Sequence, residues 1–199
     1  MRTQKSLVRT AKAGDSASQH KLGRLLLARV GVKAQHEAIH WLVCAANTNP
    51  RNALYLFDAG LALWWAEEVL RDSPKALSLI EASAKLGNID AMYFAASELA
   101  QGDLVPRNAK KSFYWYRRAA KKGHGEAQYN LAIMFLEGDG TEKDLDAFKR
   151  WIKKSAARGE SLAIETIVNC YRQGIWGFRK SDRWMQFWRQ KESKLRDSN

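Results

Sequence analysis

Apolar residues recur along the chain at the spacing of one helix face, most clearly in residues 127–158. Four of them have the helical spacing of a buried stripe with a period near 3.6 residues: Ala127, Leu131, Ala132 and Phe135. The segment GDGTEKD follows, and two glycines without an apolar residue cannot continue a buried face. The pattern therefore predicts one helix over residues 127–137 and a second over residues 145–158, stopped by Gly159.

The second predicted helix separates apolar and basic residues onto opposite faces. The core face carries Phe148, Trp151, Ile152, Ser155 and Ala156, and the opposite face carries Lys149, Arg150, Lys153 and Lys154. The segment FYWYRRAAKKG has the same arrangement upstream. Its predicted core residues are Trp115, Tyr116, Ala119 and Ala120, and its outward residues are Arg117, Arg118, Lys121 and Lys122. Basic helix faces of this kind are usually solvated.

The helix pair belongs to an internal repeat with a step of 36 residues. The glycine that ends the second helix recurs as Gly87, Gly123 and Gly159, and the alanine three residues earlier as Ala84, Ala120 and Ala156. Two diverged copies precede these, with Gly14 and Asn49 in the glycine position. Asparagine, like glycine, tolerates the left-handed conformation that ends many helices, which suggests that Asn49 adopts it. Five copies predict an array of helical hairpins.

The repeat step divides the chain into successive units within a single domain, residues 1–199. The expected repeats are residues 1–34, 35–72, 73–108, 109–144 and 145–180, followed by a capping helix over residues 181–196. The residues expected to cover the last repeat are Trp184, Phe187 and Trp188. The second copy has WWAEEVLRD in place of its inter-helix glycines, so its first helix is expected to run on through Trp64 and Trp65. Packing of the two rings into an irregular gap is slightly favoured, and the alternative is that they are exposed and form a partner or dimer surface.

These residues resemble the Sel1-like repeat, a relative of the tetratricopeptide repeat. The family pattern A-x-x-x-L-G-x-x-Y-x-x-G-x-G-V-x-x-D, with a second helix ending A-A-x-x-G, corresponds to Ala127, Leu131, Ala132 for Gly, Phe135 for Tyr, Gly138, Gly140, Thr141 for Val, Asp144, Ser155, Ala156 and Gly159. The resemblance covers residues 10–190. It implies an all-α fold, a right-handed α/α solenoid of about five helix-turn-helix repeats, used as a non-catalytic adaptor for a protein or peptide partner.

Analogy with tetratricopeptide arrays places the partner on the concave face, which the first helices line. The candidate binding residues there are Tyr55, Tyr93, Phe94, Glu126, Tyr129, Asn130 and Glu165. Tyrosines combine a large contact area with a low entropy cost and a hydroxyl for hydrogen bonding. Tyr93 and Tyr129 could equally pack on the neighbouring repeat, and the two readings stay open at this point.

The charge of the chain supports a second, less favoured hypothesis. The formal net charge is +12, with 12 Lys and Arg against 9 Asp and Glu in residues 1–100 but 21 against 12 in residues 101–199. The stacked second helices would align Arg117, Arg118, Lys121, Lys122, Lys149, Arg150, Lys153 and Lys154 into a convex stripe. Such a stripe could bind RNA, DNA or an acidic surface.

Catalytic and metal motifs are missing from the sequence, so neither an enzyme nor a cofactor is expected. The four histidines are scattered and expected on the surface, and Cys44 and Cys170 lack metal-ligand spacing and are expected as buried free thiols. The most apolar segment, residues 53–66, is too short to span a bilayer, and no signal peptide is visible, which favours a cytoplasmic protein. The oligomeric state and the partner's identity are not encoded in any motif.

Overall fold

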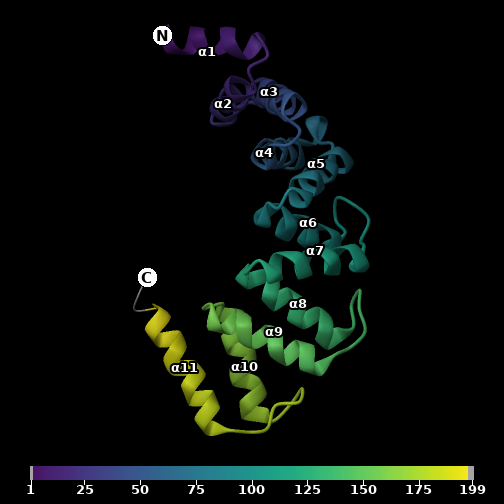
Figure 1. Ribbon diagram of the computed structural model, residues 1–199, viewed down its shortest axis with the longest axis vertical. Helices are drawn as coiled ribbons and strands as arrows, with labels where there is room; N and C mark the ends of the chain where they lie inside the picture. The colour runs from purple at the N-terminus through teal and green to yellow at the C-terminus, as the bar shows by residue number, and fades with distance from the viewer. Residues whose placement is uncertain (1, 197–199) are drawn as a thin grey trace. The chain divides into compact units, whose positions relative to one another are not determined.

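The computed structural model describes residues 2–196, and every regular element in that range is a helix (Figure 1). The α-helices are α1 (Arg2–Lys12), α2 (Ser16–Leu27), α3 (Val32–Thr48), α4 (Ala53–Trp64), α5 (Ser73–Lys85), α6 (Ile89–Gln101), α7 (Ala109–Lys121), α8 (Gly125–Glu137), α9 (Leu145–Ala157), α10 (Ser161–Gln173) and α11 (Asp182–Arg196), with a 3-10 turn, η1 (Glu68–Leu70). The all-α expectation is confirmed. The helices α8 and α9 lie where the pattern of residues 127–158 predicts them.

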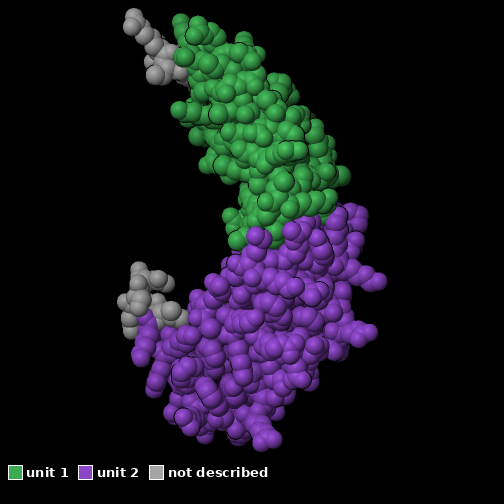
Figure 2. All heavy atoms as spheres, in the orientation of Figure 1, with its two compact units in different colours: residues 1–95 green, residues 96–199 purple. Residues whose placement is uncertain are grey.

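Two compact units divide the chain, residues 1–95 and residues 96–199 (Figure 2). In the first, α2 packs on α3, α3 on α4, and α4 on α5. Small residues permit this close approach, since a Cβ at Gly60 of α4 would stand 2.5 Å from Cγ1 of Ile80 in α5. A buried hydroxyl adds a polar tie, because Ser83 Oγ of α5 donates to the Ala53 carbonyl at 2.6 Å.

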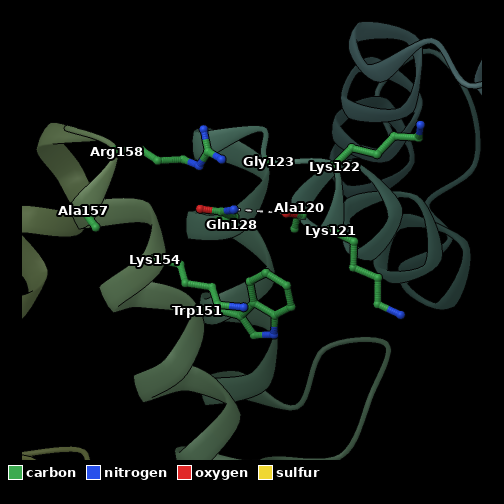
Figure 3. Close-up of a pocket in the computed structure, with 9 residues that line it drawn as sticks. All are labelled: Ala120, Lys121, Lys122, Gly123, Gln128, Trp151, Lys154, Ala157 and Arg158. Carbon is green, nitrogen blue, oxygen red and sulfur yellow. Dashed lines mark hydrogen bonds between the residues drawn. The ribbon is translucent and has the colours of Figure 1, made fainter.

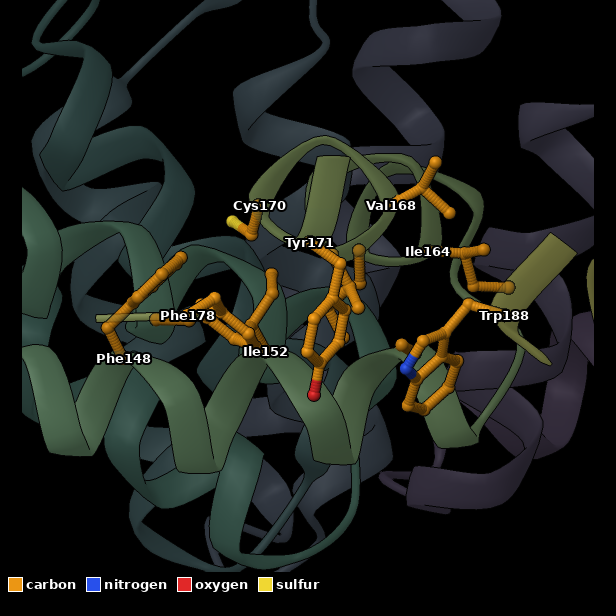
Figure 4. Close-up of a cluster of buried hydrophobic side chains, with 12 residues drawn as sticks. Phe148, Ile152, Ile164, Val168, Cys170, Tyr171, Phe178 and Trp188 are labelled. Atoms are coloured by element: carbon orange, nitrogen blue, oxygen red, sulfur yellow. The ribbon is translucent and has the colours of Figure 1, made fainter. Parts of the chain in front are cut away.

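In the second unit α7, α8, α9, α10 and α11 pack in sequence order. Ser155 repeats the tie described for Ser83, donating from α9 to the carbonyl of Gly125 at 3.0 Å. The apolar core gathers between α9 and α10 (Figure 4), and its largest members are Phe148, Ile152, Ile164, Ile167, Tyr171, Phe178 and Trp188. The predicted core residues Trp115, Tyr116, Ala119 and Ala120 of α7 are also buried.

The recurring glycines lie between helices, as the repeat predicts. Gly87, Gly123 and Gly159 have φ values of 104°, 97° and 94°, a region that side-chain-bearing residues rarely adopt. The expectation for Asn49 is wrong, because this residue ends α3 with φ −132°. The interval to the next copy is two residues longer, so the chain turns through an Asn52 N–H to Asn49 carbonyl hydrogen bond without left-handed backbone at Asn49.

Two further expectations need correction. Helix α4 ends at Trp64 instead of continuing through Trp65, and the two side chains have opposite environments: Trp64 is 1% exposed and Trp65 is 66% exposed. At the other end of the chain, only Trp188 of the three expected capping aromatics is buried, whereas Trp184 and Phe187 are each 47% exposed. Trp184 stacks on Tyr171 at 6.1 Å, so one ring face covers the last hairpin and the other faces solvent.

Candidate protein-interaction surfaces

The first candidate residue, Tyr55 of α4, stacks on the imidazole of His20 in α2, with the ring centroids 4.5 Å apart. His20 Nε2 lies 2.7 Å from Oδ2 of Asp58, and Arg24 Nη1 lies 2.9 Å from the same oxygen. Asp58 is only 8% exposed, so these two partners compensate a buried carboxylate. The expectation of a surface histidine is therefore wrong for His20. No sequence motif marks Asp58 as its partner, 38 residues away.

Phe94 of α6 lies in an aromatic group that includes both adjacent tryptophans. Its ring meets Trp64 and Trp65 edge-on, at centroid distances of 5.6 Å and 6.1 Å. Phe94 and Tyr93 are half-buried, while Trp65 extends the aromatic group into solvent. Beside Trp65 lies a hollow of about 420 Å³, lined mainly by Leu27, Leu61, Ala62 and Trp65 and edged by Arg24 and Asp58. We call Trp65, Phe94 and this hollow the Trp65 surface.

The remaining first-helix candidates lie in the second unit and divide into packing and solvent-facing residues. Tyr129 of α8 is half-buried against the core cluster of α9 and α10. Asn130 hydrogen-bonds the hydroxyl of Tyr116, whose pKa is raised by burial. Both contacts favour a packing role. Glu126 and Glu165 are exposed. Burial, together with the charge of Glu126, raises the pKa of nearby Glu160, so acidic groups gather at the start of α8.

The eight candidate basic residues occupy α7, the residue directly after it, and α9, and the structure gives them different surroundings. Arg117, Lys121, Lys122 and Arg150 are exposed. Lys149 pairs with Asp146 at 2.7 Å. The other three lie over aromatic rings: Arg118 over Trp115 at 5.2 Å, Lys153 over Phe178 at 5.5 Å and Lys154 over Trp151 at 4.5 Å. Cation–π contacts of this kind hold the aliphatic stems against the protein.

A second hollow, of about 500 Å³, lies between the end of α7 and α9 (Figure 3). Three of the candidate basic residues line it, together with a fourth cation that sequence reasoning missed: Lys121, Lys122, Lys154 and Arg158. Trp151 and Gln128 form part of its wall. In Figure 3 the amines of Lys121 and Lys122 extend away from Gln128, whereas Lys154 and Arg158 lie on the α9 side of the hollow. We call this the cationic hollow.

Gln128 is the unusual member of the cationic hollow. It is 4% exposed, and its Nε2 donates to the Ala120 carbonyl at 3.0 Å, which fixes the orientation of the amide. Its Oε1 has no hydrogen-bond partner among the described residues. The equivalent residue in the first repeat, Gln19, makes the same Nε2 contact, to Ala11, but its Oε1 accepts a hydrogen bond from Thr48 at 3.1 Å.

The repeat aligns Asn49 with Gly159, so the residue equivalent to Thr48 in the later repeat is Arg158. Its guanidinium lies beside Gly123, where a Cβ would stand 2.6 Å from Nη2. Arg158 therefore passes the glycine turn without bonding Gln128. Only the comparison of two repeats in three dimensions reveals this unpaired acceptor, since both glutamines look alike in sequence.

Other candidate chemistry is sparse in the described part of the chain. No group of three or more His, Cys, Asp or Glu residues within it is placed to hold a metal ion. None of its helices is both long and apolar enough to cross a membrane. Cys170 is fully buried and Cys44 half-buried, and both are free thiols. Sγ of Cys44 lies 3.7 Å from Nε2 of His40, one helical turn earlier on α3.

The hairpins coincide with matches to a known repeat. The family model of the Sel1 repeat matches residues 16–50, 53–88, 89–124 and 125–160, which run from α2 to the turn after α9. The chain belongs to the Sel1 repeat family. Its members are generally protein–protein interaction modules and non-catalytic scaffolds. No curated protein matches the chain.

Solved structures of Sel1 repeat proteins share the fold. The protective antigen c5321 of uropathogenic Escherichia coli, which displays a Sel1-like repeat fold, superimposes with a TM-score of 0.80 at 23% identity over 96% of this chain and 40% of its own. A Sel1 repeat protein from Oxalobacter formigenes gives a TM-score of 0.77 at 22% identity, over 92% of this chain and 74% of its own. Helicobacter pylori cysteine-rich protein B gives a TM-score of 0.53 at 17% identity, over 69% of this chain and 97% of its own. The Sel1 repeat chain thus spans less than half of c5321.

Proposed function

We propose that this Sel1 repeat chain is a non-catalytic adaptor that binds a segment of a partner protein on its first helices. The observation that carries the proposal is the side chain of Trp65, which is 66% exposed beside half-buried Phe94. Tryptophan is among the residues most enriched at energetically dominant interface positions. A partner can pack an apolar side chain into the hollow and place another against the exposed ring of Trp65.

The first-helix residues predicted to bind the partner are divided between the two units. Tyr55 and Tyr93 belong to the unit of Trp65, and Glu126, Tyr129, Asn130 and Glu165 to the other. Tyr55 and Asn130 already make packing contacts, so we assign the partner contacts chiefly to the exposed ring of Trp65 and to Phe94 beside it. A peptide lying there would meet Arg24 at the edge of the hollow, an exposed cation that can set its register.

The alternative of nucleic-acid binding through the eight basic residues has less support. Lys149 is paired with Asp146, and Arg118 and Lys153 are held on aromatic rings. Because Lys154 covers a face of Trp151, that ring is less available for stacking a base.

Affinity capture from a lysate of the source cells tests the proposal. The wild-type chain should retain a protein whose yield is unchanged by nuclease and falls at least about fivefold for Trp65→Ala, as expected for loss of an aromatic anchor. Leu162→Ala, at a 60% exposed position of α10, is the matched control and should retain the protein. Equal retention by both variants would reject the Trp65 surface, and loss of all captured protein after nuclease would favour the nucleic-acid alternative.

A further inference from the structure

The cationic hollow combines two features that a solvated basic face lacks. Its cations come from the end of α7, from α9 and from the turn after α9, and they line one recess. The guanidinium of Arg158 forms no hydrogen bond or ion pair with any described residue. Its wall holds the buried amide of Gln128, whose Oε1 is unpaired. An unsatisfied buried acceptor is costly in free energy unless a donor reaches it. The ligand that complements this hollow therefore carries both a negative charge and a hydrogen-bond donor.

We propose that the cationic hollow binds an acidic segment of a partner protein, with a carboxylate between Arg158 and Lys154 and a neighbouring backbone N–H donating to Oε1 of Gln128. The proposal rests on the adaptor function and names the chemistry of one partner segment. Arginine and carboxylate form paired, charge-assisted hydrogen bonds, which supply affinity and orientation together. Lys121 and Lys122, at the rim, contribute attraction at longer range.

Access to the amide oxygen depends on Arg158. Its side chain is exposed and lies over Gly123, a position where any Cβ would meet the guanidinium. In the proposed complex, Arg158 turns from the glycine turn toward the bound carboxylate, and the peptide backbone reaches Gln128 through the hollow. The first repeat contains no equivalent opening, because Thr48 already occupies the oxygen of Gln19.

The surroundings favour a short acidic peptide over a nucleic acid. A DNA backbone carries no hydrogen-bond donor for Gln128 and an RNA backbone offers only its 2′-hydroxyl, whereas a peptide carries a backbone N–H at nearly every residue. Lys154 covers one face of Trp151, which removes a stacking surface for a base. The positive region is also short, since Glu160 lies against Gly125, two residues beyond Gly123, with Glu126 close by. A continuous polyanion would run into these carboxylates, but one or two acidic side chains would not.

The first test measures binding of a fluorescein-labelled ten-residue peptide, two adjacent glutamates in a glycine–serine background, by fluorescence polarisation at about 50 mM salt. The matched peptide carries glutamines instead. We expect the glutamate peptide to bind at least about tenfold more tightly, through the charge-assisted contacts. Equal binding of the two peptides, or binding of neither, overturns the proposal. A labelled ten-nucleotide RNA of mixed sequence that binds more tightly than the peptide, with the steep salt dependence of phosphate contacts, also overturns it.

The second test locates the site. Lys154→Gln with Arg158→Gln should weaken the glutamate peptide about tenfold, because both charges of the recess are lost. Arg117→Gln with Arg150→Gln is the matched control, on α7 and α9, with the same change in net charge and outside the hollow. It should weaken binding less than about twofold, through the general field alone. Equal loss in the two double variants overturns the site.

The third test addresses Gln128 without changing the protein. Peptides N-methylated at successive amides lose one donor each, and one methylation next to the glutamates should weaken binding about fivefold or more. Uniform binding across the series overturns the contact with Gln128. These outcomes are separable from the adaptor proposal. If Lys154→Gln with Arg158→Gln still captures the lysate protein that Trp65→Ala loses, the adaptor proposal stands and the acidic-peptide site fails.

Discussion

The imidazole Nε2 of His20 lies 2.7 Å from the buried Oδ2 of Asp58 and joins α2 to α4 across 38 residues of chain. Replacement of Asp58 by asparagine removes the charge but keeps the shape, and leaves His20 and Arg24 without their carboxylate. We expect the free energy of unfolding to fall by about 1–3 kcal/mol. Urea denaturation followed by circular dichroism measures it. Asp146→Asn breaks the exposed Lys149 pair and serves as the control, with no measurable change expected. Similar losses in both variants would mean that burial of Asp58 contributes nothing.

Adjacent Trp64 and Trp65 should respond oppositely to truncation. Trp64→Ala empties a fully buried site next to Phe94 and should lower the free energy of unfolding by about 3–5 kcal/mol. Trp65→Ala removes a largely solvated ring and should cost less than about 1 kcal/mol. Thermal and urea unfolding of the two variants, run side by side, measure the difference. A large loss of stability for Trp65→Ala would show that its effect on partner capture is a folding defect.

The contact between Gly60 and Ile80 sets the spacing of α4 and α5. A methyl group at Gly60 would stand 2.5 Å from Cγ1 of Ile80, so Gly60→Ala should destabilise the chain by about 1–3 kcal/mol despite alanine's better helix propensity. If steric overlap is the cause, the loss should shrink in an Ile80→Ala background, where the space is free. A double-mutant cycle measures this coupling, and an additive result would exclude it.

The two cysteines should differ in reactivity. Burial raises the pKa of the Cys170 thiol from 9.0 to about 11, which leaves about one thousandth of it as thiolate at pH 8. Cys44 is only half-buried. Labelling of the native protein with a thiol reagent should therefore modify Cys44 alone, and Cys44→Ser should label only after denaturation. Rapid native labelling of the Cys44→Ser variant would contradict the burial of Cys170.

The raised pKa of Cys170 also predicts the sign of a pH effect on stability. Between pH 9 and about 11 the unfolded chain releases the thiol proton while the folded chain keeps it. The contribution of the neutral thiol is therefore complete below this window and declines as pH rises through it. Urea midpoints at pH 8 and pH 10 should show a larger alkaline loss for wild type than for Cys170→Ala. The tyrosines Tyr116 and Tyr171, whose pKa values burial also raises, act in the same direction in both proteins.

Much of the helical array follows from local pattern. The 3.6-residue periodicity predicts α8 and α9 because a helix buries one face whatever its neighbours are. The glycine step predicts the turns after α5, α7 and α9, since positive φ is a local backbone requirement. The same reasoning fails at Asn49, because two extra residues supply a different turn. It also fails at Phe187, where no following repeat covers the helix within the described chain.

The candidate sites were less accessible to such reasoning. The pattern separates the basic from the apolar face of α9 but says nothing of which cations meet around a recess, so Lys121 and Lys154 were expected together with residues that lie elsewhere. Arg158, the last residue of the helix predicted over residues 145–158, was left out of the basic set, and α9 ends one residue before it. Gln128 was overlooked because its own sequence does not show whether the next hairpin supplies a donor to its Oε1, as Thr48 does for Gln19.

The sequence by itself determined the repeat, the positions of the hairpins and most of the core, since these depend on periodicity and on residues with special backbone freedom. Only the tertiary structure decided which of two adjacent tryptophans is buried, which acid pairs with His20 and which glutamine lacks a partner. Burial and hydrogen-bond satisfaction depend on groups about 30 to 38 residues away, such as Thr48 for Gln19 and Asp58 for His20. A repeat places equivalent positions side by side in every copy, but the side chain at each position determines whether a buried polar group finds a hydrogen-bond partner.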